Sequence, residues 1–296
     1  MNQLNSRIEI REGNNVCFNS DYYELFASEG LDSFDSLWRL DIGEVVKEIE
    51  DRSVVRFEVH AKDELNETEK GPAVRVFYFK KHARERAGWS GLSEGAREFV
   101  NLCDFREAGL ATAEPVAMGE RHVTSSFVES FLITEDFFPY VSLEDIVRKQ
   151  PEILKGGANR EKRRNILKEI AAYARKMHKH GFNHRDFNAT HILIHDIESK
   201  TPRIALFDMQ RIDRNRLSRF RWAVKALAEL NFTLPFEIFP EQERFFLFLS
   251  YKGRTKMNLI DRLHWEWVKR KTARIARHTY KRWAKKRVRV YEKNVS

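Results

Sequence analysis

The spacing of the apolar residues changes along the chain, and this change narrows the folds that the sequence can adopt. The runs EVVKEIED, SVVRFEVH and AVRVFYFKKH in the first part have the length and composition of short strands. From Tyr140 onward the spacing becomes mostly helical. Strands first and helices afterwards favour an α+β fold, with a small antiparallel sheet followed by a mainly helical part.

One helix is expected within the strand-rich part. Ser93 can cap its N-terminus, and Gly109 can end it. The run SFLITEDF then has the character of a buried strand that leads into a connector. We therefore expect a bilobal chain, with lobes at residues 1–138 and 139–296, a hinge near Glu135–Pro139 and a ligand cleft between the lobes.

The second part begins with a long amphipathic helix. Ile166, Ile170, Tyr173 and Met177 recur at the spacing of one helical face, and Gly181 can end the helix. The runs HILIH and RIALFD that follow have the appearance of a short hairpin. The second lobe is therefore predicted to be mainly helical around one hairpin.

The composition argues against several classes of protein. Of the 296 residues, 42% are hydrophobic, which is too many for an intrinsically disordered chain. No run of about 18 apolar residues is present, so no membrane span is expected, and the first residues lack the apolar core of a signal peptide. Cys17 and Cys103 have no CxxC spacing, which favours reduced thiols in a cytosolic chain.

The positive charge of the chain is concentrated near its end. The net charge is +9 overall, and residues 251–296 hold 16 Lys and Arg against 3 Asp and Glu. Basic side chains interleaved with Trp265, Trp267 and Trp283 suit an anionic membrane surface. A helix that packs its aromatic residues inward would have the same pattern. No base-reading module precedes the segment, so we expect no nucleic-acid partner.

A lysine and a glutamate occur in the order that phosphoryl transfer requires. The reaction needs a cation for the nucleotide phosphates, a carboxylate for the attacking hydroxyl and ligands for Mg²⁺. Lys80 ends the apolar strand VRVFYFK, where it can contact the phosphates of ATP. Glu98 lies 18 positions later on the expected helix, from which it can pair with Lys80. Either residue alone would be an ordinary surface charge, so the prediction rests on their joint placement.

Two aspartates complete this order. Asp186 ends the motif HRD between the amphipathic helix and the hairpin, and it is the candidate that accepts a hydrogen bond from the attacking hydroxyl. Asp208 follows 22 residues later at the end of RIALFD and is a candidate metal ligand. The letters MQR follow it, where most kinases have Phe-Gly. Together the four positions indicate a kinase that uses ATP and Mg²⁺.

The connector after the strand FLITED is the predicted site of the adenine ring. Glu135 and Phe137 would line it through backbone groups, with Thr134 beside the pocket. Many buried strands have a similar sequence, so the prediction rests only on where this run lies in the chain, after Glu98 and before Asp186.

His191 stands five residues after Asp186, where most kinases have an asparagine that binds the metal. A neutral imidazole can bind Mg²⁺, although hard cations prefer oxygen. Four roles are open: a direct metal ligand, which is the prediction, a ligand through water, a hydrogen-bond partner that holds Asp186, or a structural histidine.

Several of these runs together resemble the lipopolysaccharide kinases, the Kdo/heptose kinase family. They are HRDFNATHILIHD with LFDMQR, YFKKH, REFVNLCDFREAGLAT, and FLITEDF with VSLEDI. The similarity extends from about Gly43 to Lys225. It implies a protein-kinase-like fold and transfer of the γ-phosphate of ATP to a sugar hydroxyl of the lipopolysaccharide core, on the cytoplasmic face of the inner membrane.

The resemblance also bears on the four positions and on the acceptor. Lys80 and Glu98 match the lysine–glutamate pair of the family, and Asp186 and Asp208 match its catalytic and metal aspartates. His191 is similar to the heptose-kinase branch of the family. Asn188, in contrast, is similar to the Kdo-kinase branch.

The resemblance implies a core heptose as acceptor. Lipopolysaccharide precursors are anionic and held in the membrane, so we expect the basic, tryptophan-containing C-terminal segment to dock the enzyme on the anionic inner membrane beside them. Three alternatives are a Kdo kinase, another small-molecule or protein kinase of the same fold, and a pseudokinase that serves as a binding scaffold. The sequence does not indicate an oligomeric state.

Overall fold

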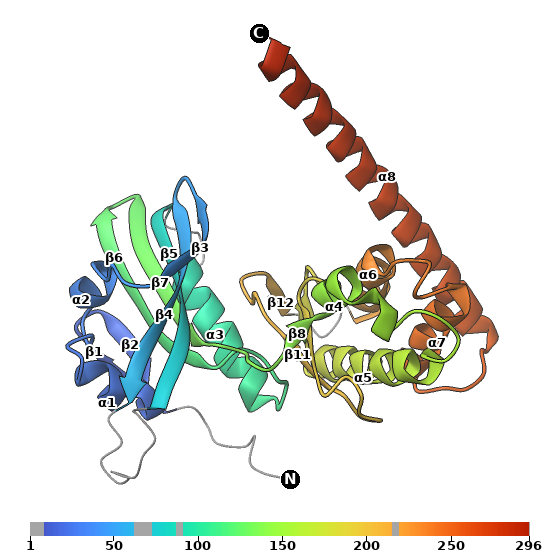
Figure 1. Cartoon of the computed structure of the whole chain (residues 1–296), viewed down its shortest axis with the longest axis horizontal. Helices are drawn as coiled ribbons and strands as arrows, with labels where there is room; N and C mark the ends of the chain where they lie inside the picture. The colour runs from blue at the N-terminus through green and yellow to red at the C-terminus, as the bar shows by residue number, and fades with distance from the viewer. Residues whose placement is uncertain (1–8, 62–72, 87–90, 215–218, 296) are drawn as a thin grey trace. The chain divides into compact units, whose positions relative to one another are not determined.

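The contacts divide the chain into two compact units (Figure 1). The first comprises Met1–Phe138 and Phe207–Gln210, and the second comprises Pro139–Leu206 and Arg211–Ser296. The sequence division at residue 138 assigns 207–210 to the second lobe, whereas their contacts group them with the first unit. The computed structural model describes residues 9–61, 73–86, 91–214 and 219–295.

The first unit contains an antiparallel sheet, which has seven strands in the described part of the chain. The order across the sheet is β1-β2-β6-β7-β5-β4-β3. The sheet predicted from the runs of β3, β4 and β5 is confirmed, and β1 and β2 extend it at the far edge, beside β6. The strands are β1 (Ile10–Gly13), β2 (Val16–Asn19), β3 (Glu44–Ile49), β4 (Arg52–Ala61), β5 (Ala73–Arg86), β6 (Pro115–Thr124) and β7 (Phe127–Glu135).

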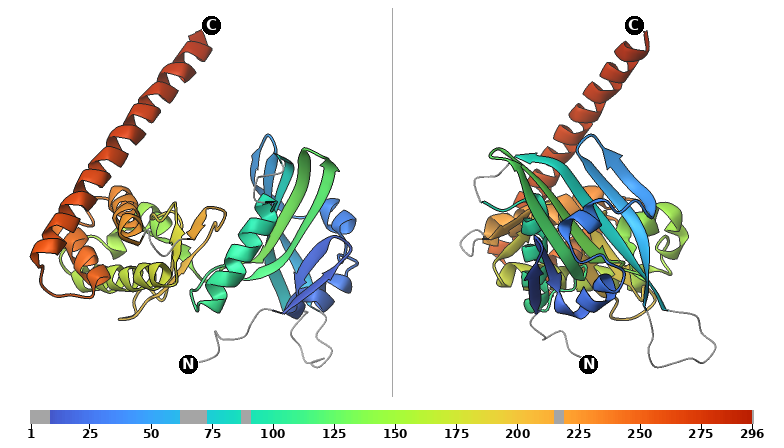
Figure 2. Two further views of the ribbon diagram at one scale, coloured as in Figure 1. Left: turned by 180° about the vertical axis from the view of Figure 1, so that it is seen from behind. Right: turned by 90° about the vertical axis from the view of Figure 1, so that its left-hand side faces the viewer.

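Helices cover both faces of this sheet. Helices α1 (Ser20–Ala27) and α2 (Phe34–Trp38) lie on one face, and α3 (Glu94–Glu107) lies on the other, as Figures 1 and 2 show. Side chains alternate between the faces along a strand. Phe77 and Phe79 of β5 therefore enter the aromatic core below α1 and α2.

The other face of β5 carries polar groups towards α3. Lys80 contacts Glu98 on that helix, and His82 contacts Glu94. One strand thus supplies both the apolar core and the lysine of the predicted site, because its pattern alternates between Phe and a polar residue.

The sequence predicted one helix in this lobe, whereas the described residues contain three, so that part of the prediction is wrong. Helices α1 and α2 have eight and five residues, which is too short for a clear helical periodicity. Their caps define them instead. Asn19 accepts a hydrogen bond from the N–H of Asp21, and Ser33 and Ser36 form a capping box.

The second unit is mainly helical around short strands. In the described residues its strands are β8 (Val141–Ser142), β9 (Phe182–His184), β10 (Ile192–His195), β11 (Arg203–Leu206) and β12 (Ile212–Arg214). Its helices are α4 (Leu143–Lys149), the 3₁₀ turn η1 (Pro151–Ile153), α5 (Arg160–Lys179), α6 (Arg219–Thr233), α7 (Glu241–Lys252) and α8 (Leu259–Val295). The predicted hairpin is confirmed as β10–β11, and β8 pairs with the other edge of β10.

Helix α5 forms the centre of this unit and has the predicted apolar face. Ile166, Ile170 and Met177 are fully buried, and Tyr173 is nearly so. Helix α5 packs on α7. The helix ends at Lys179, ahead of Gly181, whose φ of 87° places it in the left-handed region.

Helix α8 packs on the unit through its earlier turns, as far as Tyr280, whose ring centroid lies 6.2 Å from that of Phe232 in α6. Trp265 and Val268 are buried, whereas Tyr280 and Trp283 are 59% and 56% exposed. The alternative that the helix packs its aromatic residues inward is therefore correct for Trp265, which is buried, and wrong for Trp283, which is exposed. Figures 1 and 2 show the later turns of α8 extending away from α6 and α7. None of the helices in the described ranges has the length and apolar character of a bilayer-spanning helix.

Gly95 sets how closely α3 approaches the sheet, which gives a test of the fold. A Cβ on Gly95 would lie 2.6 Å from the carbonyl oxygen of Phe131 in β7. We expect Gly95→Ala to lower the free energy of unfolding by about 1–3 kcal/mol, because this backbone clash outweighs the gain in helix propensity of about 1 kcal/mol.

The matched control is Gly13→Ala, since a Cβ on Gly13 meets no atom within 4 Å. Urea unfolding of both variants measures the difference. Equal stability of the two variants would contradict the close packing of α3 on β7.

Candidate active site

Lys80 is held by a buried carboxylate. Its Nζ lies 3.0 Å and 2.8 Å from the two carboxylate oxygens of Glu98, which is only 3% exposed. Burial raises the pKa of Glu98, and the Lys80 ammonium partly offsets that effect by favouring the carboxylate form. The predicted pairing of these two residues is therefore present in the structure.

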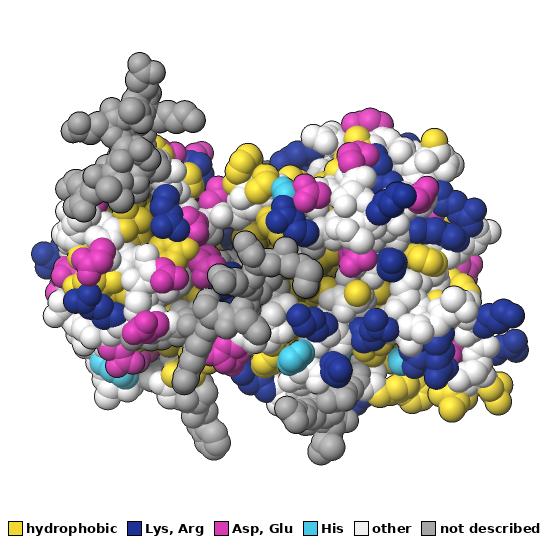
Figure 3. Space-filling view, turned by 90° about the horizontal axis from the view of Figure 1, so that it is seen from below, with side chains coloured by type: hydrophobic (Ala, Val, Ile, Leu, Met, Phe, Trp, Pro, Cys, Tyr) yellow, Lys and Arg dark blue, Asp and Glu magenta, His cyan; other side chains and the backbone are white. Residues whose placement is uncertain are grey.

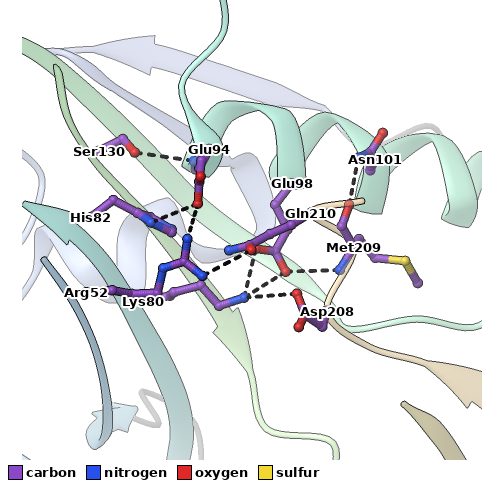
Figure 4. A network of polar contacts seen from close by, with 11 residues as sticks. Arg52, Lys80, His82, Glu94, Glu98, Asn101, Ser130, Asp208, Met209 and Gln210 are labelled. Atoms are coloured by element: carbon purple, nitrogen blue, oxygen red, sulfur yellow. Dashed lines mark hydrogen bonds and ion pairs between the residues drawn. The ribbon is translucent and has the colours of Figure 1, made fainter. Parts of the chain in front are cut away.

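Glu98 also fixes the segment that carries Asp208. Its Oε1 accepts the N–H of Met209 at 3.1 Å, and the side chain of Asn101 donates to the carbonyl of Met209 at 2.7 Å (Figure 4). Two side chains one turn apart on α3 thus hold both backbone polar groups of Met209, which fixes the two peptide units on either side of this residue. This clamp explains why residues 207–210 belong to the first unit.

Asp208 is presented next to Lys80. One carboxylate oxygen lies 3.7 Å from the Lys80 Nζ, and the side chain is 41% exposed. Its φ of 62° places Asp208 in the left-handed region, which costs free energy for a residue with a side chain and which is concentrated at functional sites. The clamp on Met209 holds the backbone in this conformation.

A second group of polar side chains packs beside this pair. Glu94 at the start of α3 contacts both Arg52 and the Nδ1 of His82, and Arg52 also donates to Gln210 at 3.4 Å (Figure 4). Burial, reinforced by the charges of Arg52 and Lys80, lowers the pKa of His82 to about 3. His82 is therefore a neutral imidazole at ordinary pH.

In the second unit, Asp186 is held by its own loop and by Arg211. The Nη1 of Arg211 donates to both carboxylate oxygens, at 3.0 Å and 3.1 Å. The N–H of Asp186 donates to the Nδ1 of His184 at 3.2 Å, and His184 is buried. His184 thus braces the loop.

His191 contacts the backbone of the same loop. Its Nδ1 lies 2.8 Å from the carbonyl oxygen of Asp186. Because a carbonyl oxygen only accepts, Nδ1 carries the hydrogen, and in the neutral ring Nε2 then carries the lone pair. The hydrogen bond to Asp186 is present, and metal binding through Nε2 stays a prediction.

Asn188 has an internal role in this loop. Its side-chain oxygen accepts the N–H of Thr190 at 3.0 Å, and its carbonyl accepts the N–H of His191 at 3.2 Å. These hydrogen bonds close a local turn from Asn188 to His191. Asn188 is therefore needed for the loop conformation, independently of any ligand.

Arg185 is tied to the strand β12. It donates to Asp213 at 2.7 Å, and its carbonyl accepts the Nζ of Lys225 at 2.8 Å. Burial acts to raise the pKa of Asp213, but hydrogen bonds from Arg185 and Asn183 outweigh it and lower that pKa. The side chain of Arg185 is thus paired with an acidic side chain of the same unit.

The side chain of Glu135, in the predicted adenine connector, is engaged within the first unit. Tyr22 donates to it at 2.7 Å and Arg75 at 2.8 Å. Its N–H donates to the carbonyl of Glu114. Contacts of Glu135 and Phe137 with a nucleotide stay predictions.

Three positioning residues escaped the sequence analysis: Asn101, Arg211 and Lys225. Asn101 lies three residues after Glu98, so the helical period places it on the same face, which was a usable signal. Arg211 and Lys225 reach the loop from segments distant in the sequence, and no local pattern indicates such contacts.

The donor groups of the predicted metal site can be compared with the needs of Mg²⁺. Hard cations take oxygen ligands, and the exposed carboxylate of Asp208 supplies them. Among the residues that the structure describes, no three His, Cys, Asp or Glu side chains gather as a ready metal site. The carboxylate chemistry fits Mg²⁺ bound together with nucleotide phosphates, since Mg²⁺ usually binds through one or two carboxylates plus such phosphates.

Comparisons with known proteins agree with this geometry. The model of the lipopolysaccharide kinase (Kdo/WaaP) family matches residues 35–251. The chain is 31% identical over 212 residues to the lipopolysaccharide core heptose(I) kinase WaaP of Escherichia coli, covering 69% of this chain and 75% of that protein. It is 30% identical over 223 residues to the enzyme of the same name from Pseudomonas aeruginosa, covering 69% and 74%.

A solved structure shows the same fold. The structure described as WaaP in complex with acyl carrier protein superposes with a TM-score of 0.64 at 24% identity, covering 88% of this chain and 98% of that one. The predicted protein-kinase-like α+β fold is therefore confirmed.

The fold and the family match define this protein as a kinase. The chain belongs to the lipopolysaccharide kinase (Kdo/WaaP) family. It is a phosphotransferase that acts on a sugar hydroxyl, and the resemblance inferred from the sequence is confirmed.

The buried His82 makes stability depend on pH. In the unfolded chain a histidine titrates near its usual pKa of 6.5, whereas in the folded protein the pKa of His82 is about 3. The unfolded state therefore takes up a proton first as the pH falls. The stability that comes from keeping His82 neutral is therefore fully present above about pH 6.5, and it is lost progressively as the pH falls below that value.

When the pH falls from about 7.5 to about 5, the free energy of unfolding of wild type should decrease. We expect this decrease to be about 2 kcal/mol smaller in His82→Gln. Urea unfolding of both proteins at the two pH values measures this double difference. An identical pH dependence in the variant would show that His82 is not kept neutral by its surroundings.

Proposed function

We propose that the protein transfers the γ-phosphate of ATP to a heptose hydroxyl of the lipopolysaccharide core. The observation that carries the proposal is the placement of Lys80, which contacts both oxygens of a buried Glu98 and lies 3.7 Å from Asp208. A cation and a carboxylate side by side are the groups that hold nucleotide phosphates and their metal ion.

The first unit would bind the nucleotide. Lys80 would contact its phosphates, and Asp208 would hold Mg²⁺, which when bound neutralises charge on the phosphate oxygens. Backbone groups of Glu135 and Phe137 would contact the adenine ring. The Met209 clamp fixes the Asp208 carboxylate beforehand, so binding requires little reorganisation of the protein.

Asp186 would orient the acceptor. Its carboxylate accepts a hydrogen bond from the attacking hydroxyl and takes the proton as the new oxygen–phosphorus bond forms and the bond to the leaving ADP oxygen breaks. Arg211 holds this carboxylate in place in the structure. His191 would serve as the second metal ligand through Nε2.

Two findings support heptose over Kdo as the acceptor. The curated relatives are named heptose(I) kinases. Asn188, the residue similar to the Kdo-kinase branch, is accounted for by its hydrogen bond within the loop. It therefore carries little weight as an indicator of the acceptor.

Asp186→Asn tests the chemical step. We expect kcat with lipopolysaccharide core as acceptor to fall by roughly 10²- to 10⁴-fold, since asparagine cannot take up the proton. The control is Asp196→Asn, which changes an aspartate on the turn after β10 that pairs with Arg203. Near-normal turnover in Asp186→Asn, with the control also active, would remove Asp186 from the chemistry.

The C-terminal helix is the proposed site of membrane docking, which would place the enzyme on the cytoplasmic face of the inner membrane. On the face shown in Figure 3, Lys and Arg side chains are more frequent over the second unit than over the first. The later turns of α8 expose Arg277, Lys281 and Arg282 together with Trp283. Exposed cations and a tryptophan suit an interface of anionic lipid.

Neutralising Arg277, Lys281 and Arg282 to glutamine is expected to weaken binding to anionic vesicles, most strongly at low salt. Vesicle sedimentation at two salt concentrations measures the effect. The control variant neutralises three exposed cations elsewhere in the second unit, Arg160, Lys168 and Lys200. If both variants lose the same affinity, only net charge matters and α8 has no special part.

A further inference from the structure

A pocket of about 520 Å³ lies in the second unit between β12, α6 and α8. This volume falls within the range of about 300–1,000 Å³ that is usual for small-ligand sites. The lining residues on which the inference rests are Asp213, Phe220, Arg221, Lys225, Trp267 and Lys271. None of them was singled out by the sequence analysis as part of the active site.

Aromatic rings form one wall of the pocket. Phe220 and Trp267 stand edge to face, with ring centroids 5.2 Å apart, and they are 45% and 53% exposed. Trp222, in contrast, is buried. Two exposed aromatic rings beside a cavity offer flat apolar surfaces, against which the C–H face of a sugar ring can pack.

The other side chains of the lining give the pocket a positive charge. Four of them are cationic, Arg214, Arg221, Lys225 and Lys271, and one is acidic, Asp213. Asp213 is already neutralised by its ion pair with Arg185 at 2.6 Å. Within the described part of the chain, Arg221 and Lys271 form no ion pair with a carboxylate. Glu229 of α6 lies within electrostatic range of Lys225 and Lys271. The four cations still outnumber Asp213 and Glu229, so the pocket has an excess of positive charge that a bound anion would balance.

The pocket adjoins the predicted catalytic loop through two of its lining residues. The Nζ of Lys225 contacts the carbonyl of Arg185, the residue before Asp186, and Asp213 binds the side chain of Arg185. A ligand in this pocket would thus lie next to the loop that carries the Asp186 carboxylate. Both contacts lie entirely within the second unit.

We propose that this pocket binds the anionic part of the acceptor, namely carboxylate or phosphate groups on the carbohydrate that bears the reacting hydroxyl. The cations would bind its anionic groups, and Trp267 and Phe220 would pack on its sugar rings. The inference rests on the proposed function, because it assigns the acceptor of that same reaction to a site. A carbohydrate is favoured over a lipid head group because the pocket combines ring-stacking surfaces with cations beside the catalytic loop.

The test compares the variants Arg221→Ala, Lys271→Ala and Trp267→Leu with wild type, with deacylated lipopolysaccharide core oligosaccharide as acceptor. We expect the two cation variants to raise the KM for the oligosaccharide by roughly 10- to 100-fold, while the KM for ATP stays unchanged. Arg270→Ala is the matched control, since Arg270 is exposed on the same helix and does not line the pocket.

Two modified acceptors distinguish the anionic groups. If the pocket binds phosphates, dephosphorylated oligosaccharide binds to wild type as weakly as intact oligosaccharide binds to the cation variants. If it binds carboxylates, oligosaccharide with its carboxyl groups reduced behaves in this way. Calorimetric binding without ATP gives the same comparison independently of turnover.

The outcomes separate this inference from the proposed function. Normal transfer by wild type together with an unchanged oligosaccharide KM and affinity in the cation variants would overturn the pocket assignment alone. Loss of anionic-vesicle binding in these variants, at an unchanged oligosaccharide KM, would also overturn it, because the pocket would then contact lipid. Oligosaccharide binding by wild type that the cation variants lose, without phosphate transfer by wild type, would support the pocket and contradict the proposed function.

Discussion

The buried carboxylate of Glu98 is the group on which the first unit depends. A charge that is almost completely excluded from water is costly unless it is compensated. Here the Lys80 ammonium and the N–H of Met209 compensate it. These contacts join β5, α3 and the segment of Asp208, so the same interaction that stabilises the unit also places its two candidate phosphate-site residues.

The need to compensate the buried charge of Glu98 explains other features of the first unit. Gly95 allows the start of α3 to approach β7 closely, which brings Glu98 within reach of Lys80. Asn101 completes the hold on Met209 from the next turn of the helix. The left-handed backbone of Asp208 is maintained by these contacts and would otherwise be unfavourable.

The second unit is organised around the loop of Asp186 in a comparable way. His184 accepts a hydrogen bond from the backbone N–H of Asp186, and His191 donates one to the carbonyl of Asp186. Arg211 holds the carboxylate, and Lys225 reaches the preceding residue. The histidine that departs from the usual kinase pattern therefore has a clear part in the loop conformation. That part does not depend on whether its other nitrogen binds a metal ion.

Much of the fold was predictable because it follows from local periodicity. The strands β3 to β5, the cap of α3 at Ser93 and the buried face of α5 all appear where the apolar pattern indicates them. Helices α1 and α2 were missed because they are too short to show a period. The order of the site residues was readable from the sequence.

The partners of the site residues were less predictable. The N–H of Met209 binds a glutamate 111 positions away, and Arg211 binds an aspartate 25 positions away. Such contacts arise when segments distant in the chain pack together, and they leave no local pattern. The cationic pocket beside the loop has the same origin, because it joins residues of β12, α6 and α8.

The proposed reaction is phosphorylation of a heptose of the lipopolysaccharide core. The most direct measurement incubates the purified protein with ATP labelled at the γ-phosphate, Mg²⁺ and deacylated core oligosaccharide, and then locates the label by tandem mass spectrometry. We expect one labelled phosphate on a heptose residue. Label on Kdo, or no transfer by a folded protein that binds ATP, would contradict this proposal.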